Sequence, residues 1–168
     1  VLDRVARRRG WSLIFAHLNH DLRGEESDGD EALVRRLAEG LGWTCVVDRA
    51  AVRERAAREG ISVEMAARLS RHRFLAQTAV NHSASRVLLA HHGDDQVELF
   101  FIRLLRGTGS GGLGGMKLQA QSPVESRVRL VRPLLGCSRQ MIESFARKHE
   151  VEFRDDASNR DRGILRNR

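Results

Sequence analysis

Short apolar runs alternate with longer amphipathic stretches through the first half of the chain. The apolar runs cover residues 12–18, 43–48 and 86–90, and they have the length of strands that are covered on both faces. Apolar residues recur at helical spacing between them, which predicts helices over residues 1–9, 27–41, 51–59 and 62–79. Strands that alternate with helices predict an α/β fold, in which a parallel sheet is flanked by helices with right-handed crossovers.

Glycine and serine residues mark the ends of these helices. Gly10, Gly42 and Gly60 each follow a helical stretch and are expected to end it. Ser62 is placed to cap the helix that follows it. The sequence Ser27-Asp28-Gly29-Asp30 predicts a capping box at the start of the helix over residues 27–41.

The pattern weakens in the last third of the chain. A strand is predicted over residues 128–135, a helix capped by Ser138 follows, and residues 119–126 resemble a linker. The length is that of one domain. We interpret residues 1–127 as its core and residues 128–168 as a basic extension of the same domain.

Polar residues gather where the predicted strands end. Ligands of open parallel sheets bind beyond the carboxyl ends of the strands. This places several histidines and aspartates at one edge, namely His17, His20, Asp48, His91, His92, Asp94 and Asp95.

The predicted helix that begins near Gly93 carries three acids on one face. Asp94 and Asp95 lie four and three residues before Glu98, so the carboxylates repel unless a metal, a cation or a proton separates them. Asp94 and Asp95 could instead cap the helix, and His92 could be an ordinary loop histidine. Together with both histidines, Asp95 and Glu98 favour a functional site.

Six glycines fall within residues 107–115. This tract resembles a phosphate loop, but it lacks the Lys-Ser/Thr ending of that motif and follows a helix instead of a strand. Glycine at this density allows a close backbone approach to a ligand or a tight reversal, and a flexible connector is the alternative.

Composition indicates a globular protein without a membrane anchor. Hydrophobic residues make up 41% of the 168 residues and charged residues 30%, and no apolar run approaches the length that spans a bilayer. Residues 1–11 have no apolar segment of the kind found in signal peptides. Cys45 and Cys137 lie far apart, which argues against a disulfide framework, a zinc site or a cysteine-held cluster and favours the reducing cytoplasm.

The net charge of +7 is concentrated late in the sequence. Residues 1–100 hold 15 Lys and Arg against 15 Asp and Glu, whereas residues 101–168 hold 14 against 7. Such asymmetry suggests a surface that faces nucleic acid, with a merely soluble basic surface as the alternative. With 5% aromatic residues, a general single-strand binder is disfavoured.

Five segments resemble, in order, the motif blocks of the tRNA(Ile)-lysidine synthetase family. They are HLNHDLRGEESDGDEALVRRLAEGLG, EMAARLSRHRFL, AHHGDDQVELFFIRLLRGTGSGGLGGM, RPLL and DDASNRDRGILRNR. The match covers about residues 12–168, and its third block is the most specific. That family consists of PP-loop ATPases of the adenine-nucleotide α-hydrolase type, so the resemblance implies a Rossmann-like parallel sheet.

The resemblance also implies a reaction. With ATP and Mg²⁺ as cofactors, such a cytoplasmic ligase adenylates C2 of the wobble cytidine in the CAU anticodon of tRNA(Ile). The amine of L-lysine then attacks that carbon and forms lysidine.

Site residues follow from the matching motifs. Asp95 and Glu98, with Asp94, would bind the lysine ammonium and help to deprotonate the attacking amine. The substrate-binding residues would be His91, His92, Arg68 and Arg71, and the two arginines would lie near phosphate or the activated base. The ATP pocket would be lined by His17, His20 and Arg23, while the metal ligands stay unknown.

The implied tRNA contacts lie in the basic part of the chain. They are Arg103, Arg106, Arg132, Arg166, Asn167 and Arg168. A solvated surface position is the alternative for each of the arginines.

Two departures from the family pattern stand out. The S-G-G-x-D-S pyrophosphate loop is absent, and with it the central first strand that should lie between residues 12–18 and 86–90. Two unpaired sheet edges would result, so we expect a fragment of a longer chain or an altered pairing, such as a homodimer. His72 stands where the family usually has Tyr, and we expect this change to alter packing alone.

Two other functions compete with lysidine synthesis. A tRNA cytidine thiolase shares the core but needs cysteine pairs for its cluster, which this sequence lacks. A catalytically silent RNA-binding module would account for the missing loop, but it explains poorly why Asp95, Glu98 and both histidines are present.

Overall fold

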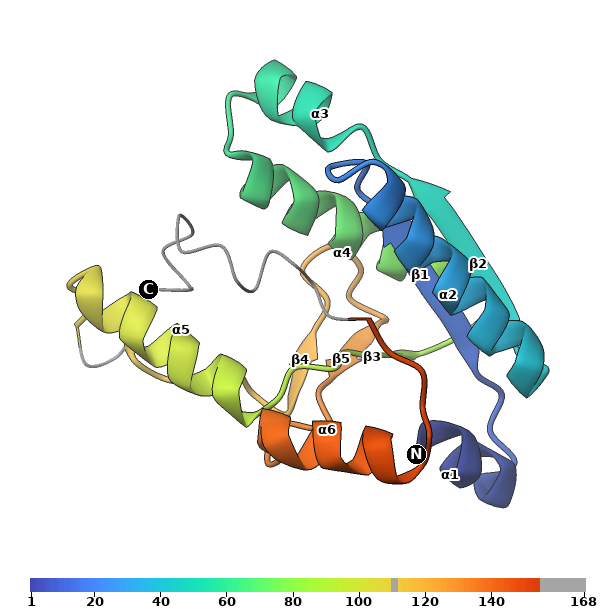
Figure 1. Ribbon diagram of the computed structural model, residues 1–168. Helices are drawn as coiled ribbons and strands as arrows, with labels where there is room; N and C mark the ends of the chain where they lie inside the picture. The colour runs from blue at the N-terminus through green and yellow to red at the C-terminus, as the bar shows by residue number, and fades with distance from the viewer. Residues whose placement is uncertain (110–111, 155–168) are drawn as a thin grey trace. The chain divides into compact units, whose positions relative to one another are not determined.

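The computed structural model describes residues 1–109 and 112–154 (Figure 1). The chain divides into two compact units, which we call the N-terminal unit (Val1–Ser85 with Ser122–Val128) and the C-terminal unit (residues 86–121 with the described part of 129–168). The boundary between the units therefore crosses the chain three times. The division into a core of residues 1–127 and a basic extension of the same domain stays a prediction.

Two parallel strands and a crossover helix form the centre of the N-terminal unit. Strand β1 (Ile14–Asn19) pairs with β2 (Thr44–Arg49), from Ile14 opposite Thr44 to Asn19 opposite Arg49. Parallel neighbours need a long connection, and α2 (Glu25–Leu41) supplies it while packing along both strands. The predicted strand–helix–strand unit is confirmed.

Helix α1 (Leu2–Arg9) is fastened to the far end of α2. It ends at Gly10, whose φ of 66° is the left-handed conformation that glycine adopts without strain. The Arg7 guanidinium donates to the Leu41 carbonyl at 2.6 Å and lies over the Trp43 ring. Trp43 in turn donates its indole N–H to Asp3 at 2.8 Å.

Helices α3 (Val52–Glu59) and α4 (Val63–Asn81) pack on each other through small side chains. Their shared core contains Val52, Ala56 and Ala66, all at most 6% exposed. Because alanine is short, it lets the two helix backbones approach closely. Ser62 caps α4 as predicted, since its hydroxyl accepts a hydrogen bond from the Met65 amide at 3.1 Å.

The C-terminal unit holds a small mixed sheet in the order β3, β5, β4. Strand β3 (Arg86–Leu88) pairs in parallel with β5 (Arg129–Val131), and β4 (Gln119–Gln121) pairs antiparallel with β5. Helix α5 (Gly93–Leu105) follows β3, and α6 (Arg139–Lys148) follows β5. Ser138 caps α6 through the Met141 amide at 3.2 Å, as predicted.

Two local predictions are wrong. Helix α2 begins at Glu25, so Ser27 lies inside it, and its hydroxyl accepts from the Arg23 amide at 3.3 Å instead of forming a capping box. Residues 119–121 form β4 instead of a linker, because pairing with β5 satisfies their backbone groups.

Strands β1 and β3 belong to different sheets. Within residues 1–109 and 112–154, β1 pairs with β2 alone and β3 with β5 alone, and no described strand joins them. In the same residues, none of the helices combines the length and the apolar character needed to span a bilayer.

Candidate functional site

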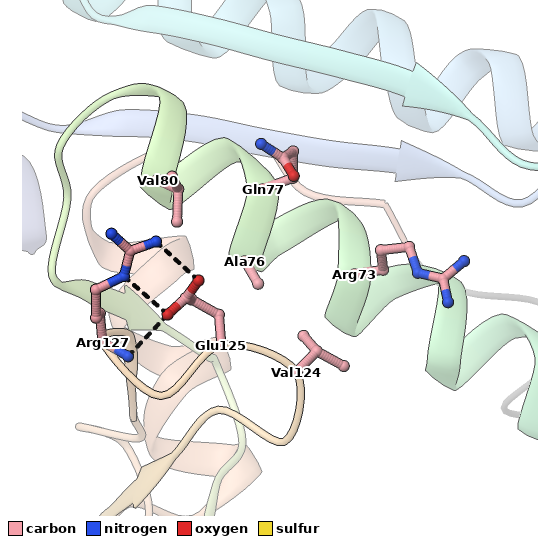
Figure 2. Close-up of a pocket in the computed structure, with 7 residues that line it drawn as sticks. All are labelled: Arg73, Ala76, Gln77, Val80, Val124, Glu125 and Arg127. Carbon is pink, nitrogen blue, oxygen red and sulfur yellow. Dashed lines mark hydrogen bonds and ion pairs between the residues drawn. The ribbon is translucent and has the colours of Figure 1, made fainter.

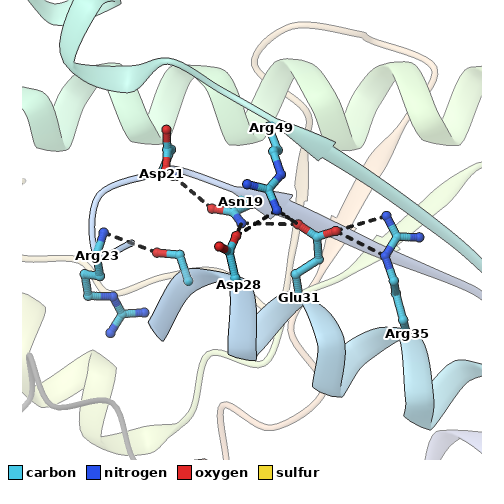
Figure 3. Close-up of polar contacts among 8 residues, drawn as sticks. Asn19, Asp21, Arg23, Asp28, Glu31, Arg35 and Arg49 are labelled. Carbon is cyan, nitrogen blue, oxygen red and sulfur yellow. Dashed lines mark hydrogen bonds and ion pairs between the residues drawn. The ribbon is translucent and has the colours of Figure 1, made fainter. Parts of the chain in front are cut away.

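A buried asparagine, Asn19, lies at the carboxyl end of β1 and contacts α2 (Figure 3). Asn19 is 2% exposed, and its amide N–H groups donate to Asp28 Oδ1 and Glu31 Oε2, each at 3.2 Å. Its side-chain oxygen accepts from the Asp21 amide at 2.9 Å. One side chain thus joins the strand, the following loop and the first turns of α2.

Two arginines surround the same carboxylates. Arg49 Nη2 lies 2.7 Å from Asp28 Oδ1 and 3.1 Å from Glu31 Oε2, and Arg35 donates to Glu31 Oε1 at 3.1 Å (Figure 3). The hydrogen bond from Asn19, followed by those arginines, lowers the pKa of Glu31. We call Asn19, Asp28, Glu31, Arg35 and Arg49 the β1 latch.

The latch fixes the loop that carries His20 and Arg23. Asp21 has a φ of 50°, a conformation that aspartate tolerates better than most residues because its short side chain bonds locally. The Arg23 guanidinium bonds Asp30 at 2.9 Å. Arg23, predicted to line the ATP pocket, therefore turns toward the acids of α2.

A cationic cluster, which consists of His17, His20, Arg68 and Arg71, forms next to this loop. Burial lowers the pKa of His17 and of His20, and the nearby charge of Arg71 lowers that of His20 further. Arg71 is exposed as a residue, yet surrounding atoms desolvate its guanidinium and, together with the Arg68 charge, lower its pKa. Both histidines are therefore neutral at pH 7 while the arginines stay charged.

The two arginines of the cluster have no acid partner among the described residues, whereas Glu31 and Asp30 lie near enough to His17 to affect its pKa. Neither Arg68 nor Arg71 makes an ion pair with any carboxylate in the described parts of the chain, and the buried His20 Nδ1 has no hydrogen-bond partner there. Paired arginines with open donors suit a phosphate or another anion. The structure thus brings together four residues that the sequence placed in the nucleotide and substrate sites.

The predicted catalytic aspartates lie at helix starts. The Asp95 carboxylate accepts from the backbone amide of His92, the N-cap of α5, at 2.8 Å. Asp94 Oδ2 accepts from the Arg139 amide at 2.7 Å, and this hydrogen bond is the main cause that lowers the pKa of Asp94. His92 Nδ1 lies 3.5 Å from Asp94 Oδ2.

Both aspartates therefore accept a backbone amide at a helix start, and for Asp95 this is the capping alternative raised by the sequence. Asp94 caps α6 from outside that helix, and Asp95 caps its own helix. Glu98 and His91 are half-buried on the same segment. Catalytic roles for these acids stay predictions.

The start of α5 packs tightly on the chain segment before α6. The Gly93 amide donates to the Cys137 carbonyl at 2.8 Å, and a Cβ at residue 93 would lie 3.1 Å from that oxygen. The carbonyl of Leu135 would be 3.5 Å away. Since these neighbours are backbone, they cannot swing aside.

The change Gly93→Ala is expected to destabilise the C-terminal unit by about 1–3 kcal/mol, because the added methyl group forces the backbone apart. Urea denaturation measures the effect. Gly136→Ala is the matched control, since a Cβ there would meet nothing within 4 Å, and it should change stability by less than about 0.5 kcal/mol. Equal stability of the two variants would show that this contact is not tight in solution.

Helix α5 holds the described part of the glycine tract. The Gln96 side chain donates to the Met116 carbonyl at 2.9 Å and accepts from the Met116 amide at 2.5 Å. Arg103 donates to the carbonyls of Gly112 and Gly114. The tract is therefore bound along α5, which agrees with a tight reversal better than with a flexible connector.

The predicted tRNA contacts have different surroundings. Arg103 holds the glycine tract, and Arg106 is exposed at the end of α5. Arg132 is 8% exposed and donates to the Lys117 carbonyl at 2.9 Å, and its contact with tRNA stays a prediction. Arg166, Asn167 and Arg168 lie outside the described residues.

The sequence did not single out Asn19, Glu31, Arg49 or Gln96. A polar residue at the end of an apolar run was a usable signal for Asn19, since a buried amide must find partners. Gln96 bonds backbone twenty residues away, and no local pattern indicates such a contact.

A magnesium site is not assembled by the residues that the structure describes. No group of three or more His, Cys, Asp and Glu side chains among them could hold a metal ion, and the Asp94 and Asp95 carboxylates already accept backbone amides. The use of Mg²⁺, which the family resemblance implied, stays a prediction.

Comparison with known proteins decides the family. Residues 1–168 match the family described as PP-loop domain. The chain belongs to the PP-loop domain family. This match spans the chain and does not confirm the predicted loss of the pyrophosphate loop, which stays a prediction.

Two curated relatives of this PP-loop domain carry the same name. This chain is 43% identical over 156 residues to the tRNA(Ile)-lysidine synthase of Geobacter sulfurreducens, and the match covers 93% of this chain and 32% of the relative. It is 35% identical over 170 residues to the enzyme of that name from Dehalococcoides mccartyi, covering 100% and 36%. The chain thus spans about a third of the length of these relatives.

A solved structure confirms the α/β fold. The U34-tRNA thiolase NcsA from Methanococcus maripaludis, with its [4Fe-4S] cluster, matches with a TM-score of 0.69 at 14% identity. The match covers 92% of this PP-loop domain and 52% of that protein. At this identity the likeness concerns the fold alone.

Proposed function

We propose that this PP-loop domain is the ATP-dependent catalytic part of a tRNA(Ile)-lysidine synthetase. The relatives supply the reaction class, and the observation that carries the proposal is the cationic cluster. A site in which two guanidiniums have no acid partner among the described residues, beside neutral histidines, suits a polyphosphate and a nucleobase.

The proposed substrates are ATP, L-lysine and the CAU-anticodon tRNA(Ile). In the first step, O2 of the wobble cytidine attacks the α-phosphorus of ATP, and pyrophosphate leaves. In the second, the lysine amine attacks C2 of the adenylated cytidine, loses one proton and displaces AMP.

The described residues have separate tasks in this scheme. Arg68 and Arg71 bind phosphate oxygens and offset the charge that develops when pyrophosphate leaves. His17 and His20 contact the nucleotide without adding charge, because burial keeps them neutral. Asp95 and Glu98 bind the lysine ammonium and help to deprotonate the attacking amine, while the Asp95 carboxylate also accepts the His92 amide.

A direct test measures lysine incorporation into a tRNA(Ile) transcript. The full-length protein, ATP and radiolabelled lysine are incubated with a transcript that has a CAU anticodon, and a transcript with a UAU anticodon is the control. We expect ATP-dependent label in the first RNA alone. Release of pyrophosphate without labelled RNA would rule out the proposed reaction.

The thiolase alternative has less support. The one feature in common with the solved thiolase is the fold, and this chain provides Cys45 and Cys137, which lie in different units. Dimer formation and the cytoplasmic location stay predictions.

A further inference from the structure

A pocket of about 480 Å³ lies within the N-terminal unit, between α4 and the loop of residues 122–128 (Figure 2). Arg73 stands at one end of the pocket and the pair Glu125 and Arg127 at the other, with apolar side chains between them. Neither the proposed chemistry nor the family comparison uses this pocket.

The charges at the two ends of the pocket differ. Glu125 and Arg127 form two side-chain hydrogen bonds of 3.0 Å, and these bonds lower the pKa of Glu125 to about 2. That pair is neutral as a whole. Arg73 makes no ion pair with any carboxylate in the described parts of the chain, so it leaves the pocket with one uncompensated positive charge.

The middle of the pocket is apolar and partly open. Ala76 is 5% exposed and forms the floor, while Val80 and Val124 are 37% and 48% exposed. The volume is far larger than a single phosphate and falls in the range of about 300–1,000 Å³ that small organic ligands occupy. An apolar surface with a cation at one end fits a nucleotide, because the flat base can contact the apolar side chains while the phosphate contacts the cation.

The pocket is separate from the cationic cluster. Arg73, Ala76 and Val80 are spaced by three and four residues and so share one face of α4. Arg71 precedes Arg73 by two residues, which turns it about 200° around the helix axis. A ligand in this pocket would therefore lie on the other side of α4 from the site proposed for ATP.

We infer that this pocket binds one unpaired nucleotide of the tRNA substrate, with the base over Val80 and Val124 and the phosphate on Arg73. The inference rests on the proposed function in one respect, because that function supplies RNA as the partner. It adds an anchoring contact outside the site of chemistry.

Equilibrium binding of the tRNA transcript to the full chain, without ATP or lysine, tests the inference. At 100 mM salt, Arg73→Gln is expected to weaken binding about fivefold and to reduce the slope of log K against log salt by about 0.7–0.9, the loss of one phosphate contact. Val124→Asn is expected to weaken binding about threefold with the slope unchanged, because it removes apolar contact without altering charge.

Two matched variants serve as controls. Arg53→Gln removes an exposed arginine of α3 that makes no ion pair within residues 1–109 and 112–154, and Val63→Asn changes a valine that is 38% exposed. Both should leave affinity and slope unchanged. If Arg73→Gln weakens tRNA binding but Val124→Asn does not, Arg73 makes a simple surface contact and the pocket does not bind a nucleotide. If neither substitution weakens binding, the inference is wrong. If the predicted binding changes appear but no lysidine forms, the proposed function fails and this site stands.

Discussion

Replacing Arg71 with glutamine is expected to lower kcat/KM for lysidine formation by about 10²- to 10³-fold, the usual cost of removing one donor from a developing anion. Arg71 is exposed as a residue although its guanidinium is partly desolvated, and it has no described acid partner, so its charge is available to the substrate. Glutamine keeps most of the length and the polarity but loses the charge and the forked donors.

The matched variants separate this role from a structural one. Arg71→Lys keeps the charge and should recover part of the activity, while Arg53→Gln changes a surface arginine and should behave like the wild type. The thermal midpoint of Arg71→Gln should stay close to that of the wild type, because no described salt bridge is lost. Wild-type activity in Arg71→Gln would remove the cationic cluster from the mechanism.

Replacing Asn19 with leucine is expected to reduce the free energy of unfolding by roughly 3 kcal/mol, since hydrogen bonds to charged groups contribute about 1.5–3 kcal/mol each and Asp28 is partly solvated. Leucine has nearly the same size, so the loss reflects the missing donors to Asp28 and Glu31 and the orphaned Asp21 amide. Urea denaturation measures it. Asn81→Leu, at an exposed position, is the control.

The variant Asn19→Asp gives an independent check through its pH dependence. A third carboxylate between Asp28 and Glu31 would have a raised pKa in the folded state, because like charges disfavour its ionisation. The folded state then binds more protons than the unfolded state, so this variant should lose stability relative to the wild type as pH rises from about 4 to 7. A difference that does not change with pH would contradict the proximity of these carboxylates.

The sequence predicted those parts of the fold that depend on nearby residues. Ser62 and Ser138 cap the helices that follow them, and the runs at residues 12–18 and 43–48 are adjacent parallel strands. Such features follow from side-chain spacing and from hydroxyl groups within three residues of the amides that they cap.

Features set by distant partners were not predictable in this way. Asp94 caps a helix that begins 45 residues later, and Gln119–Gln121 becomes a strand because β5 lies beside it. The sequence could not distinguish caps from catalysts among Asp94, Asp95 and Glu98, and their catalytic roles stay predictions. Arg68 and Arg71 were singled out by motif, and the structure adds that they have no described acid partner.

The contact between Gln96 and Met116 also affects which amino-acid substitutions this chain would tolerate at these two positions. Both hydrogen bonds from Gln96 go to main-chain atoms of Met116, and every amino acid except proline offers the same two groups. The constraint is therefore one-sided. Residue 96 must keep a side-chain amide, because that group makes both hydrogen bonds. Residue 116 must keep only its backbone position, so its side chain can change without weakening the bonds that hold the glycine tract.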